Sequence, residues 1–486
     1  MAYYFISIGG SGSKILEALT HITVAGILPS NEKLNIIAID PDSGNGNFTR
    51  TSTSLNNFIK FQNVLVGDDS TLFKNKIELL SGENSPWNPV KRNDRLDDLM
   101  AASLNRDTSL GKLYRSLYTK AERETFLNEG FRGHPSIGAA VLARKYASPD
   151  SNDNQWQTFI NKIKNVIDNS SNLVKIFIAG SIFGGTGAAG IPTIARLIRQ
   201  SLPNSQNKIL IGGAMILPYF NFIPKDTKND ELFARSENFL TNSKAALKYY
   251  SQDDNDFDFM YLLGEASMGN VKFSVGGEEQ KNDAHIIELY AALAAADFYA
   301  QNKVNRTIFK YVCRKEQNTL DWADLQNLTP DFKKRFVQFT RFIFAYIQHV
   351  LPVLKNPPST GFWSRLFKKV PPWYVDIVER ERIDIHENEV QIFERYAKDF
   401  CLWLQQIESW DGLNVNLISR NAFNVNQVND GVNVTISESN FNTCVPSDDD
   451  SLNLDVIFTR LSESANVEAK GFGKLLRRLY DSCYKA

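Results

Sequence analysis

The stretch Lys175–Gln200, KIFIAGSIFGGTGAAGIPTIARLIRQ, decides the fold of this chain. Its apolar residues Ile176–Ala179 predict a fully buried strand. A glycine-rich turn follows at Phe183–Gly190, and apolar residues then recur at the spacing of one helix face up to Ile198. A strand, a glycine loop and a helix start present backbone N–H groups and a positive helix end to a phosphate. Glycine loops also join strands to helices for packing reasons alone, so both interpretations stay open.

The composition indicates a large cytoplasmic protein. The chain has 486 residues, of which 43% are hydrophobic, and this length predicts two or three domains. A net charge of −1 gives no overall attraction to nucleic acid or to an anionic membrane. The N-terminal residues Met1–Ile6 predict a first strand rather than a signal peptide, and no apolar run reaches the roughly 18 to 20 residues of a membrane span. The four cysteines lack metal-ligand spacing, and we expect free thiols at Cys313, Cys401, Cys444 and Cys483.

A second glycine loop lies near the N-terminus. The predicted strand Tyr3–Ile8 is followed by Gly9–Lys14, GGSGSK, and then by a helix pattern. This is not a P-loop, because Ile15 stands where that motif requires Ser or Thr. The next buried strand ends at Asp40-Pro41-Asp42, and an acidic residue at that place commonly bonds a ribose hydroxyl, although Asp40 and Asp42 could equally be turn acids. The first fifty residues alone therefore also fit a dinucleotide-binding unit.

Strand and helix patterns alternate as far as residue 300, which predicts an α/β fold with a mostly parallel sheet and helices on both faces. A helix over Asp283–Tyr299 is so apolar that we expect it to be buried between layers. Beyond it the pattern predicts a helical start, a small sheet and amphipathic helices. We expect a nucleotide-binding domain over 1–281, a central core helix and acidic loop over 282–326, and a divergent α+β C-terminal domain over 327–486.

Five motifs, in order, resemble the tubulin and FtsZ superfamily over roughly residues 3–326. FGGTGAAGIP is similar to the tubulin signature, and IGGSGSK to the family's first glycine loop. FRGHPSIGAA resembles the loop near the γ-phosphate, and Asn282-Asp283 resembles the start of the central helix, where the family contacts the guanine base. LDWADL is similar to the acidic loop at the far end of that helix. Beyond residue 326 the chain is closer to diverse bacterial tubulin-like proteins than to tubulin or FtsZ.

The resemblance implies a tubulin-like fold, GTP or GDP as ligand, and Mg²⁺ held mainly by phosphate and water with no dedicated protein metal site. It implies phosphate contacts from Gly9, Gly10, Ser11, Gly12, Ser13, Lys14, Gly184, Gly185, Thr186, Gly187 and Ala188, and a γ-phosphate loop at Gly133, His134, Pro135 and Ser136. Asn282 and Asp283 would contact the base, and Asp40 and Asp42 the ribose. Asp321 and Asp324 would act catalytically in the nucleotide site of the next subunit, so hydrolysis would require assembly.

The chain departs from the family pattern, and several residues have simpler interpretations. Phe183 replaces the signature's first Gly, and Ala188 and Ala189 replace its hydroxyl residue and last Gly. Lys14 stands where Asn is common, and it could contact phosphate or lie solvated. Asn282 could be only a helix cap, and Asp321 and Asp324 could be helix-start acids. His134 could be a surface histidine, and His285 with Glu288 suggests a hydrogen-bonded pair rather than metal ligands.

Three functional hypotheses follow. The first is a tubulin-like GTPase that self-associates head to tail and hydrolyses GTP at the subunit junction, which generates open filaments. The second is a nucleotide-dependent scaffold or switch without long filaments, in a bacterial multi-component system such as defence against phage, with a protein partner at the C-terminal domain. The third is an NAD-dependent oxidoreductase, which explains neither the second glycine loop nor LDWADL. The sequence leaves guanine and adenine open.

Overall fold

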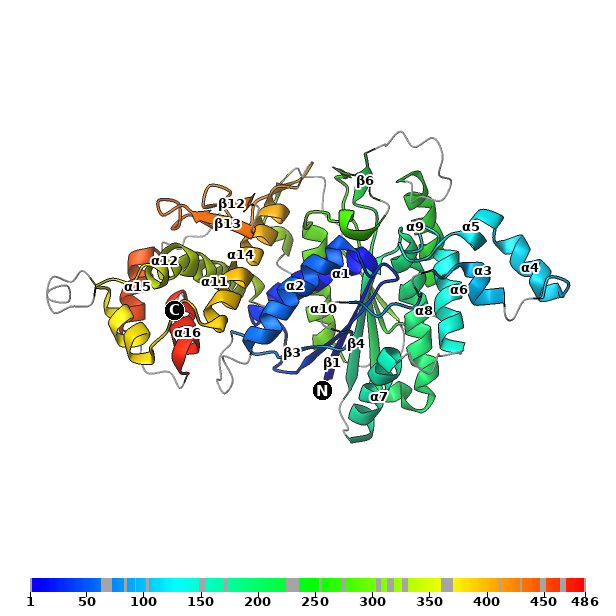
Figure 1. The fold of residues 1–486 in the computed structure, drawn as a ribbon, viewed down its shortest axis with the longest axis horizontal. Helices are drawn as coiled ribbons and strands as arrows, with labels where there is room; N and C mark the ends of the chain where they lie inside the picture. The colour runs from blue at the N-terminus through cyan, green and yellow to red at the C-terminus, as the bar shows by residue number, and fades with distance from the viewer. Residues whose placement is uncertain are drawn as a thin grey trace.

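The computed structural model describes residues 2–62, 72–82, 85–91, 93–101, 105–147, 154–169, 173–223, 236–252, 256–272, 274, 276–302, 307–312, 319–325, 331–359, 370–410, 412–428, 431–445, 452–463 and 469–484. At its centre is a seven-stranded sheet in the order β3-β2-β1-β4-β5-β7-β9 (Figure 1). The strands are β1 (Ala2–Ile8), β2 (Leu34–Ile39), β3 (Ile77–Leu79), β4 (Val174–Ser181), β5 (Ile209–Ile216), β7 (Phe259–Leu263) and β9 (Ile308–Val312). Every neighbouring pair is parallel, which confirms the predicted mostly parallel α/β fold.

The central strands are apolar throughout because helices cover both faces of the sheet. Strands β2, β4 and β5 are buried at every position. Along β1, Tyr3 and Phe5 join one core cluster, whereas Tyr4 and Ile6 join the other, as the two-residue period of a strand requires. The edge strand β9 alternates between half-buried and exposed residues. Its neighbour β7 therefore marks where the fully covered part of the sheet ends.

The helices divide between the two faces. Helices α1 (Gly9–Val24), α2 (Gly46–Phe61) and α10 (Ile286–Ala300) contribute to the cluster that contains Tyr3 and Phe5. Helices α7 (Asn154–Asn169) and α8 (Gly185–Ser201) contribute to the opposite cluster. The predicted core helix is confirmed as α10, in which 13 residues are buried, and it packs beside α1. Its start is closed by a capping box between His285 and Glu288.

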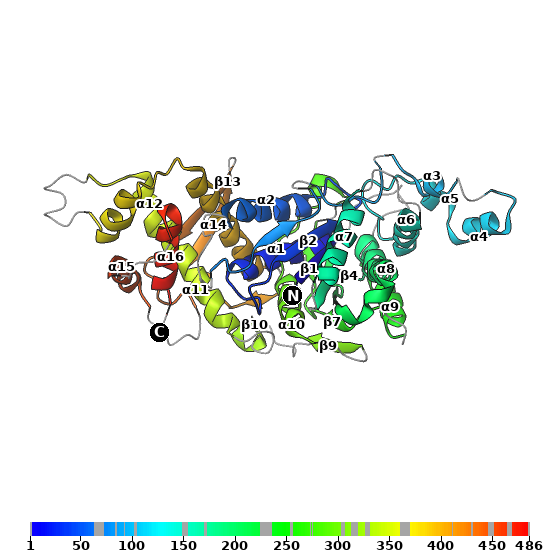
Figure 2. The same cartoon turned by 90° about the horizontal axis from the view of Figure 1, so that it is seen from below.

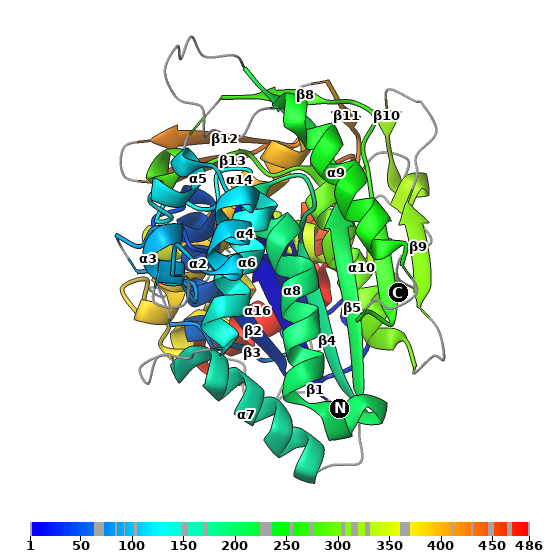
Figure 3. The ribbon, with the colours of Figure 1, turned by 90° about the vertical axis from the view of Figure 1, so that its right-hand side faces the viewer.

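The molecule is elongated, with helical groups at both ends of the sheet (Figure 2). At one end lie α3 (Leu96–Ala101), α4 (Ser109–Leu117), α5 (Lys120–Glu124) and α6 (Pro135–Ala147), of which α6 packs on α8 (Figure 1). Near the carboxyl ends of the strands, β6 (Phe220–Phe222) pairs with β8 (Gly269–Val271), and α9 (Ser236–Tyr250) runs down the side of the sheet (Figure 3). Short 3-10 turns cover Pro203–Lys208 and Gly277–Glu279.

The C-terminal half lies against α1 and α2. It contains α11 (Phe332–Ala345), a π-helical turn at Tyr346–Val350, α12 (Leu351–Lys355), a π-helical segment at Tyr374–Glu379, α14 (Asn388–Glu408), α15 (Leu454–Glu463) and α16 (Gly471–Ser482), with the hairpin β12 (Phe423–Val428) and β13 (Gly431–Ile436). Its apolar side chains belong to the same core cluster as those of α1 and α10. The domain boundaries predicted from the sequence therefore stay predictions. The thiols of Cys401, Cys444 and Cys483 are buried and form no disulfide within the described residues, and Cys313 lies outside those residues.

One expectation about the later segments needs correction. The alternating patterns at Leu413–Ile418 and Val432–Ile436 predict strands of one small exposed sheet. Strand β11 (Asn414–Val415) pairs instead with β10 (Thr319–Leu320), in parallel. In the described residues β12 and β13 pair only with each other, as an antiparallel hairpin. In the same part of the chain, no described helix combines the length and the apolar character that a membrane crossing requires.

The end of α14 depends on a buried carboxyl group. Glu408 is 1% exposed, and its Oε1 accepts hydrogen bonds from the backbone N–H groups of Leu417 (3.2 Å) and Ile418 (2.9 Å). Among the described residues, its Oε2 has no hydrogen-bond partner. Burial raises the pKa of Glu408 from 4.5 to about 8, although the two N–H groups oppose the shift.

We therefore expect Glu408→Gln to become more stabilising, relative to wild type, as the pH rises. The folded wild type binds a proton that the unfolded chain has lost, so its stability falls between pH 4.5 and about pH 8. The amide oxygen of Gln retains both hydrogen bonds, and because the amide does not titrate, its contribution to stability does not fall as the pH rises. Urea unfolding at pH 5 and pH 8 measures the effect, with the exposed Glu389→Gln on the same helix as control. If the free energy of unfolding of Glu408→Gln differed from that of wild type by the same amount at both pH values, the expectation would be contradicted.

Candidate functional site

Two glycine loops meet at the carboxyl edge of the sheet. Strands β1 and β4 are direct neighbours, and the helices that follow them, α1 and α8, begin at Gly9 and Gly185. Neither helix start has a side chain that caps its backbone N–H groups. The two positive helix ends and their free N–H groups therefore point to one region, which is the arrangement that attracts an anion.

Two positions in these loops, Gly9 and Gly187, require glycine because neighbouring segments of the chain approach their backbone closely. Gly9 has φ +69°, and a Cβ there would lie 3.2 Å from Cβ of Thr186, in the other loop. A Cβ on Gly187 would lie 2.3 Å from the carbonyl oxygen of Ser181, which no side chain tolerates. The loops consequently touch one another, and only glycine allows them to come this close.

The segment Glu129–His134 forms a third wall. A Cβ on Gly185 would lie 2.8 Å from the backbone nitrogen of Gly133, so this segment packs directly on the start of α8. Gly130 has φ +82° and Gly133 has φ +81°, and Arg132 between them also lies in the left-handed region at φ +45°. The side chain of Arg132 is held by Glu129, with Nη2 2.7 Å from Oε2. The predicted γ-phosphate loop thus lies against the second glycine loop at Gly133.

These segments enclose a cavity of about 120 Å³. Ten of the predicted site residues line it, namely Gly9, Gly10, Ser11, Asp40, Asp42, Gly133, Gly184, Gly185, Thr186 and Gly187. The sequence interpretation missed other lining residues, namely Asn45, Glu129, Gly130, Phe131, Arg132, Ser181, Phe183, Phe220, Phe222, Phe239, Ser274 and Gln280, together with Ile8. Glu129 and Gly130 directly precede a recognised motif, and Phe131, Arg132 and Phe183 lie within recognised motifs. Phe220, Phe222 and Phe239 carried no local signal.

Acidic side chains line one part of this cavity. Asp40 is 3% exposed and accepts hydrogen bonds from the backbone N–H of Asp42 (3.1 Å) and from Nδ2 of Asn45 (3.3 Å). Burial, with the neighbouring Asp42 carboxylate, raises the pKa of Asp40 well above its usual range, and burial also raises the pKa of Asp42. In the described residues, no group of three or more His, Cys, Asp or Glu side chains could hold a metal ion.

Several predicted residues do not line the cavity. A Cβ on Gly12 would lie 2.8 Å from the carbonyl oxygen of Ala179, and the Ser13 hydroxyl donates to the Gly9 carbonyl at 3.2 Å, so both serve the packing of α1. Ala188 lies within the first turn of α8. His134 pairs with Glu122, with Nδ1 3.2 Å from Oε1, and Pro135 and Ser136 begin α6.

Lys14 is turned into the core and not toward the cavity. It is 2% exposed, and its Nζ lies 2.5 Å from Oε1 of Glu288 on α10. The same Glu288 oxygen accepts a hydrogen bond from the Tyr219 hydroxyl at 2.7 Å, and the rings of Tyr219 and Trp410 lie 5.6 Å from Nζ. Burial lowers the pKa of Lys14, an effect that Glu288 opposes. Lys14 therefore joins α1 to α10, and we assign it no phosphate contact.

Asn282 and Asp283 lie before α10, at the contact with α2 and α14. The backbone nitrogen of Asn282 donates to Oδ1 of Asn47 at 2.9 Å, and its carbonyl accepts from Arg50 at 2.9 Å. Oδ1 of Asp283 accepts from Nε2 of Gln406 at 2.7 Å. Neither residue lines the glycine-loop cavity, so a base contact by them stays a prediction.

The acidic loop 320–325 does not lie beyond the far end of α10, where the resemblance placed it. The far end of α10 packs on the start of β1, where the Tyr299 hydroxyl donates to the carbonyl of Tyr4 at 2.9 Å. The chain then passes along the sheet as β9, and the Asp324 carbonyl accepts from the hydroxyl of Tyr290, the fifth residue of α10, at 3.2 Å. Figure 3 shows β10 and β11 beyond the upper end of β9, far from the N-terminus. Strand β9 lies between α10 and the loop in the chain, and its direction, parallel to β7, returns the chain to the carboxyl edge of the sheet.

Within this loop the carboxylates bond to their own backbone. Oδ2 of Asp324 accepts from the backbone nitrogen of Asp321 at 3.0 Å, and Oδ1 of Asp321 accepts from that of Ala323 at 2.7 Å. Trp322 is buried between them, and its Nε1 donates to the Leu417 carbonyl at 2.9 Å. These bonds are the ones expected of helix-start acids, and a catalytic role for Asp321 and Asp324 stays a prediction.

Together the fold and the cavity define a class: an α/β protein with an anion-attracting cavity built from glycine loops at the carboxyl edge of a parallel sheet. A model of the tubulin-like family matches residues 4–307, which is more than half of the chain. The chain belongs to this tubulin-like family. The matched segment includes both glycine loops and α10 and ends before the acidic loop. No curated protein matches the sequence.

We expect Lys14→Met to destabilise the fold by about 3 to 5 kcal/mol, because it leaves the buried Glu288 carboxylate without its cation. Urea unfolding at pH 7 measures the change. The double variant Lys14→Met, Glu288→Gln removes the stranded charge and should recover part of the loss. Lys33→Met, which breaks a half-exposed ion pair with Glu78, is the control and should cost about 1 kcal/mol or less. If Lys14→Met also lowered the free energy of unfolding by only about 1 kcal/mol or less, the role of Lys14 in joining α1 to α10 would be refuted.

Proposed function

We propose that this protein binds a guanine nucleotide through its phosphates at the glycine-loop cavity. The observation that carries the proposal is that two uncapped helix starts, from neighbouring strands, converge on one cavity lined by glycine backbone. Such a site offers several N–H donors and two positive helix ends to a polyanion. The Thr186 hydroxyl on the same wall adds a further donor.

The remaining walls suit the rest of a nucleotide. Phe220, Phe222 and Phe239 line the same cavity and offer ring surfaces to a base. Asp42 and Glu129 would repel bare phosphates, and a Mg²⁺ ion carried by the phosphates would offset this charge and could take carboxylate oxygens as ligands. The cavity of about 120 Å³ is smaller than the roughly 300 to 1,000 Å³ of typical ligand sites, so binding requires the walls to move apart.

Whether nucleotide binding leads to head-to-tail assembly and hydrolysis depends on the position of the acidic loop 320–325. Head-to-tail assembly with hydrolysis at the junction requires a loop that enters the neighbour's nucleotide site from the opposite end of the subunit. The position of Asp324 beside Tyr290, with its carboxylate bonded inside the loop, gives this mechanism no support. We therefore favour a nucleotide-dependent switch or scaffold over a filament-forming GTPase, and the two hypotheses are separated by experiment.

Gly184→Asp tests the phosphate site. Gly184 directly precedes α8, and its backbone is extended, with φ −86° and ψ 178°. An added Cβ there would have only the Ser181 hydroxyl nearby, at 3.4 Å, so a side chain fits. Asp is therefore a favourable N-cap residue at this position. Its carboxylate would block the helix N–H groups and repel phosphate. We expect affinity for Mg²⁺–GTP, measured by calorimetry, to fall at least about tenfold relative to the neutral cap Gly184→Asn. Equal affinity in the two variants, both folded, would refute the proposal, as would tight binding of NAD but not GTP.

Sedimentation and phosphate release test the consequence of binding. For a switch, we expect the wild type with GTP to remain in the supernatant, and Asp324→Ala to leave both GTP affinity and any slow turnover within about threefold of wild type. Asn414→Ala, which removes a side-chain bond to Thr319 near the same loop, is the control. Pelleting that depends on GTP, with turnover lost in Asp324→Ala alone, would establish the filament-forming GTPase instead.

A further inference from the structure

A single cationic side chain lines the described part of the glycine-loop cavity. Among the described residues of the lining, Arg132 is the only Lys or Arg, and the carboxyl groups of Asp40, Asp42 and Glu129 share the lining with it. Lys14, the cation within the first glycine loop, is buried in the core and does not line the cavity. A polyanion in this cavity would therefore find its side-chain cation at Arg132.

The backbone at Arg132 has a conformation that favours other residues. The His134 N–H donates to the Phe131 carbonyl at 2.8 Å, and the two residues between them, Arg132 and Gly133, have φ +45° and φ +81°. Positive φ at both central positions is the pattern of a type I′ turn, which Gly, Asn and Asp adopt at low cost and arginine does not. The turn therefore does not account for an arginine at this position, whereas a role of its side chain would.

This turn is fixed against the start of α8. Phe131 is buried, and a Cβ on Gly185 would lie 3.0 Å from the Phe131 carbonyl oxygen and 2.8 Å from the backbone nitrogen of Gly133. Arg132 lies between these two residues in the chain. Its backbone is therefore held beside the free N–H groups of the helix that the proposed phosphates would approach.

The guanidinium of Arg132 is only weakly committed. Among the described residues its one partner is Glu129, with Nη2 2.7 Å from Oε2, and its Nε has none. The Arg132 side chain is 19% exposed and that of Glu129 is 41% exposed. Ion pairs with this much exposure contribute little to stability, so an anion with more charge can take the guanidinium from Glu129.

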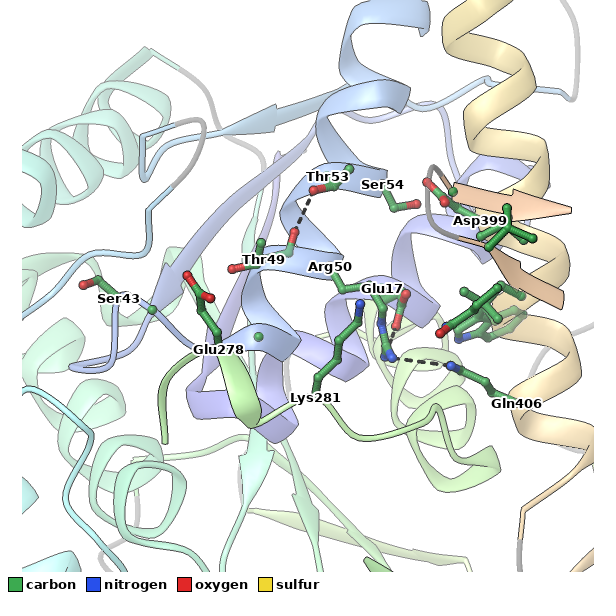
Figure 4. Close-up of a pocket in the computed structure, with 18 residues that line it drawn as sticks. Glu17, Ser43, Thr49, Arg50, Thr53, Ser54, Glu278, Lys281, Asp399 and Gln406 are labelled. Carbon is green, nitrogen blue, oxygen red and sulfur yellow. Dashed lines mark hydrogen bonds and ion pairs between the residues drawn. The ribbon is translucent and has the colours of Figure 1, made fainter. Parts of the chain in front are cut away.

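Arg50 shows the contrast with a committed arginine. It lines a second cavity, of about 660 Å³, between α2, α14 and the β12–β13 hairpin, and this cavity shares no lining residue with the glycine-loop cavity (Figure 4). The Arg50 guanidinium donates to Oε2 of Glu17 at 2.6 Å, to the Asn282 carbonyl at 2.9 Å and to Oε1 of Gln406 at 3.4 Å. Three partners on separate segments make Arg50 a structural residue, whereas Arg132 can be released to a ligand.

We propose, building on nucleotide binding at the glycine loops, that Arg132 makes this site select a nucleoside triphosphate over the diphosphate. The two helix starts hold the inner phosphates, and the third phosphate extends to the wall that Arg132 occupies. There the guanidinium leaves Glu129 for the terminal phosphate, which carries more charge and more acceptor oxygens than one carboxylate. A diphosphate leaves the pair of Arg132 and Glu129 intact, so this pair distinguishes the two states of the switch.

Calorimetric titration of the full-length protein with Mg²⁺–GTP and Mg²⁺–GDP tests the proposal. We expect wild type to bind GTP at least about tenfold more tightly than GDP, and Arg132→Gln to reduce this preference to about threefold or less while GDP affinity stays within about twofold. Arg132→Gly should lose the preference equally and keep a melting temperature close to that of wild type, because glycine suits the positive φ. Glu129→Gln, which removes the competing carboxylate, should tighten GTP binding about threefold or more.

Arg123→Gln is the matched control, because Nη1 of Arg123 also pairs with a carboxylate, Oδ2 of Asp97 at 3.0 Å, but Arg123 does not line the cavity. It should leave both affinities unchanged. The absence of a GTP preference in wild type, a preference that persists in Arg132→Gln, an equal loss of both affinities, or weaker GTP binding by Glu129→Gln would each overturn the selection by Arg132. Nucleotide binding itself would stand in those cases, whereas a wild type that binds neither nucleotide would overturn both proposals.

Discussion

The structure depends on the contact between two loops that lie 177 positions apart in the chain, at Gly9 and Thr186, where an added Cβ would come within 3.2 Å of its neighbour. The contact exists because β1 and β4 are adjacent and parallel, so the helices that follow them start side by side. Two uncapped helix ends at this distance would repel one another through their partial positive charges, and an anion between them relieves that repulsion. The convergence of the two helix starts, on which the proposed anion site rests, is therefore a consequence of strand order.

Behind these loops, the buried ion pair of Lys14 and Glu288 joins α1 to α10. A lysine in a glycine loop suggests a phosphate ligand, yet this one lies five residues after Gly9, beyond the first turn of α1, and points away from the cavity into the core. Tyr219 and Trp410 close the pair off from water. The cation thus stabilises the contact that holds the glycine loop in place, and it makes the start of α10 rigid.

The wall that separates the two cavities consists of the turn after β2 and the segment before α10. Its outer side faces α2 and α14, and its inner side carries Asp42 and Asn45 into the glycine-loop cavity. A displacement of this wall by a ligand on either side would change the shape of the other cavity. If nucleotide binds as proposed, this shared wall is a physical route to the C-terminal half, and the hydrogen bonds through Gln280 are the contacts that would have to change.

Local patterns in the sequence were sufficient for the parallel sheet, the two glycine loops and the buried helix α10, because strand burial, glycine turns and helix periodicity are properties of short segments. The family resemblance added Gly133 to the predicted residues that line the cavity. Only the tertiary structure decided the direction in which Lys14 points and the course of strand β9, which carries Asp324 back alongside α10. The same holds for the placement of Phe220, Phe222 and Phe239 in the cavity wall. Each of these depends on which distant segment packs against a residue, and a single sequence carries no local signal for such contacts.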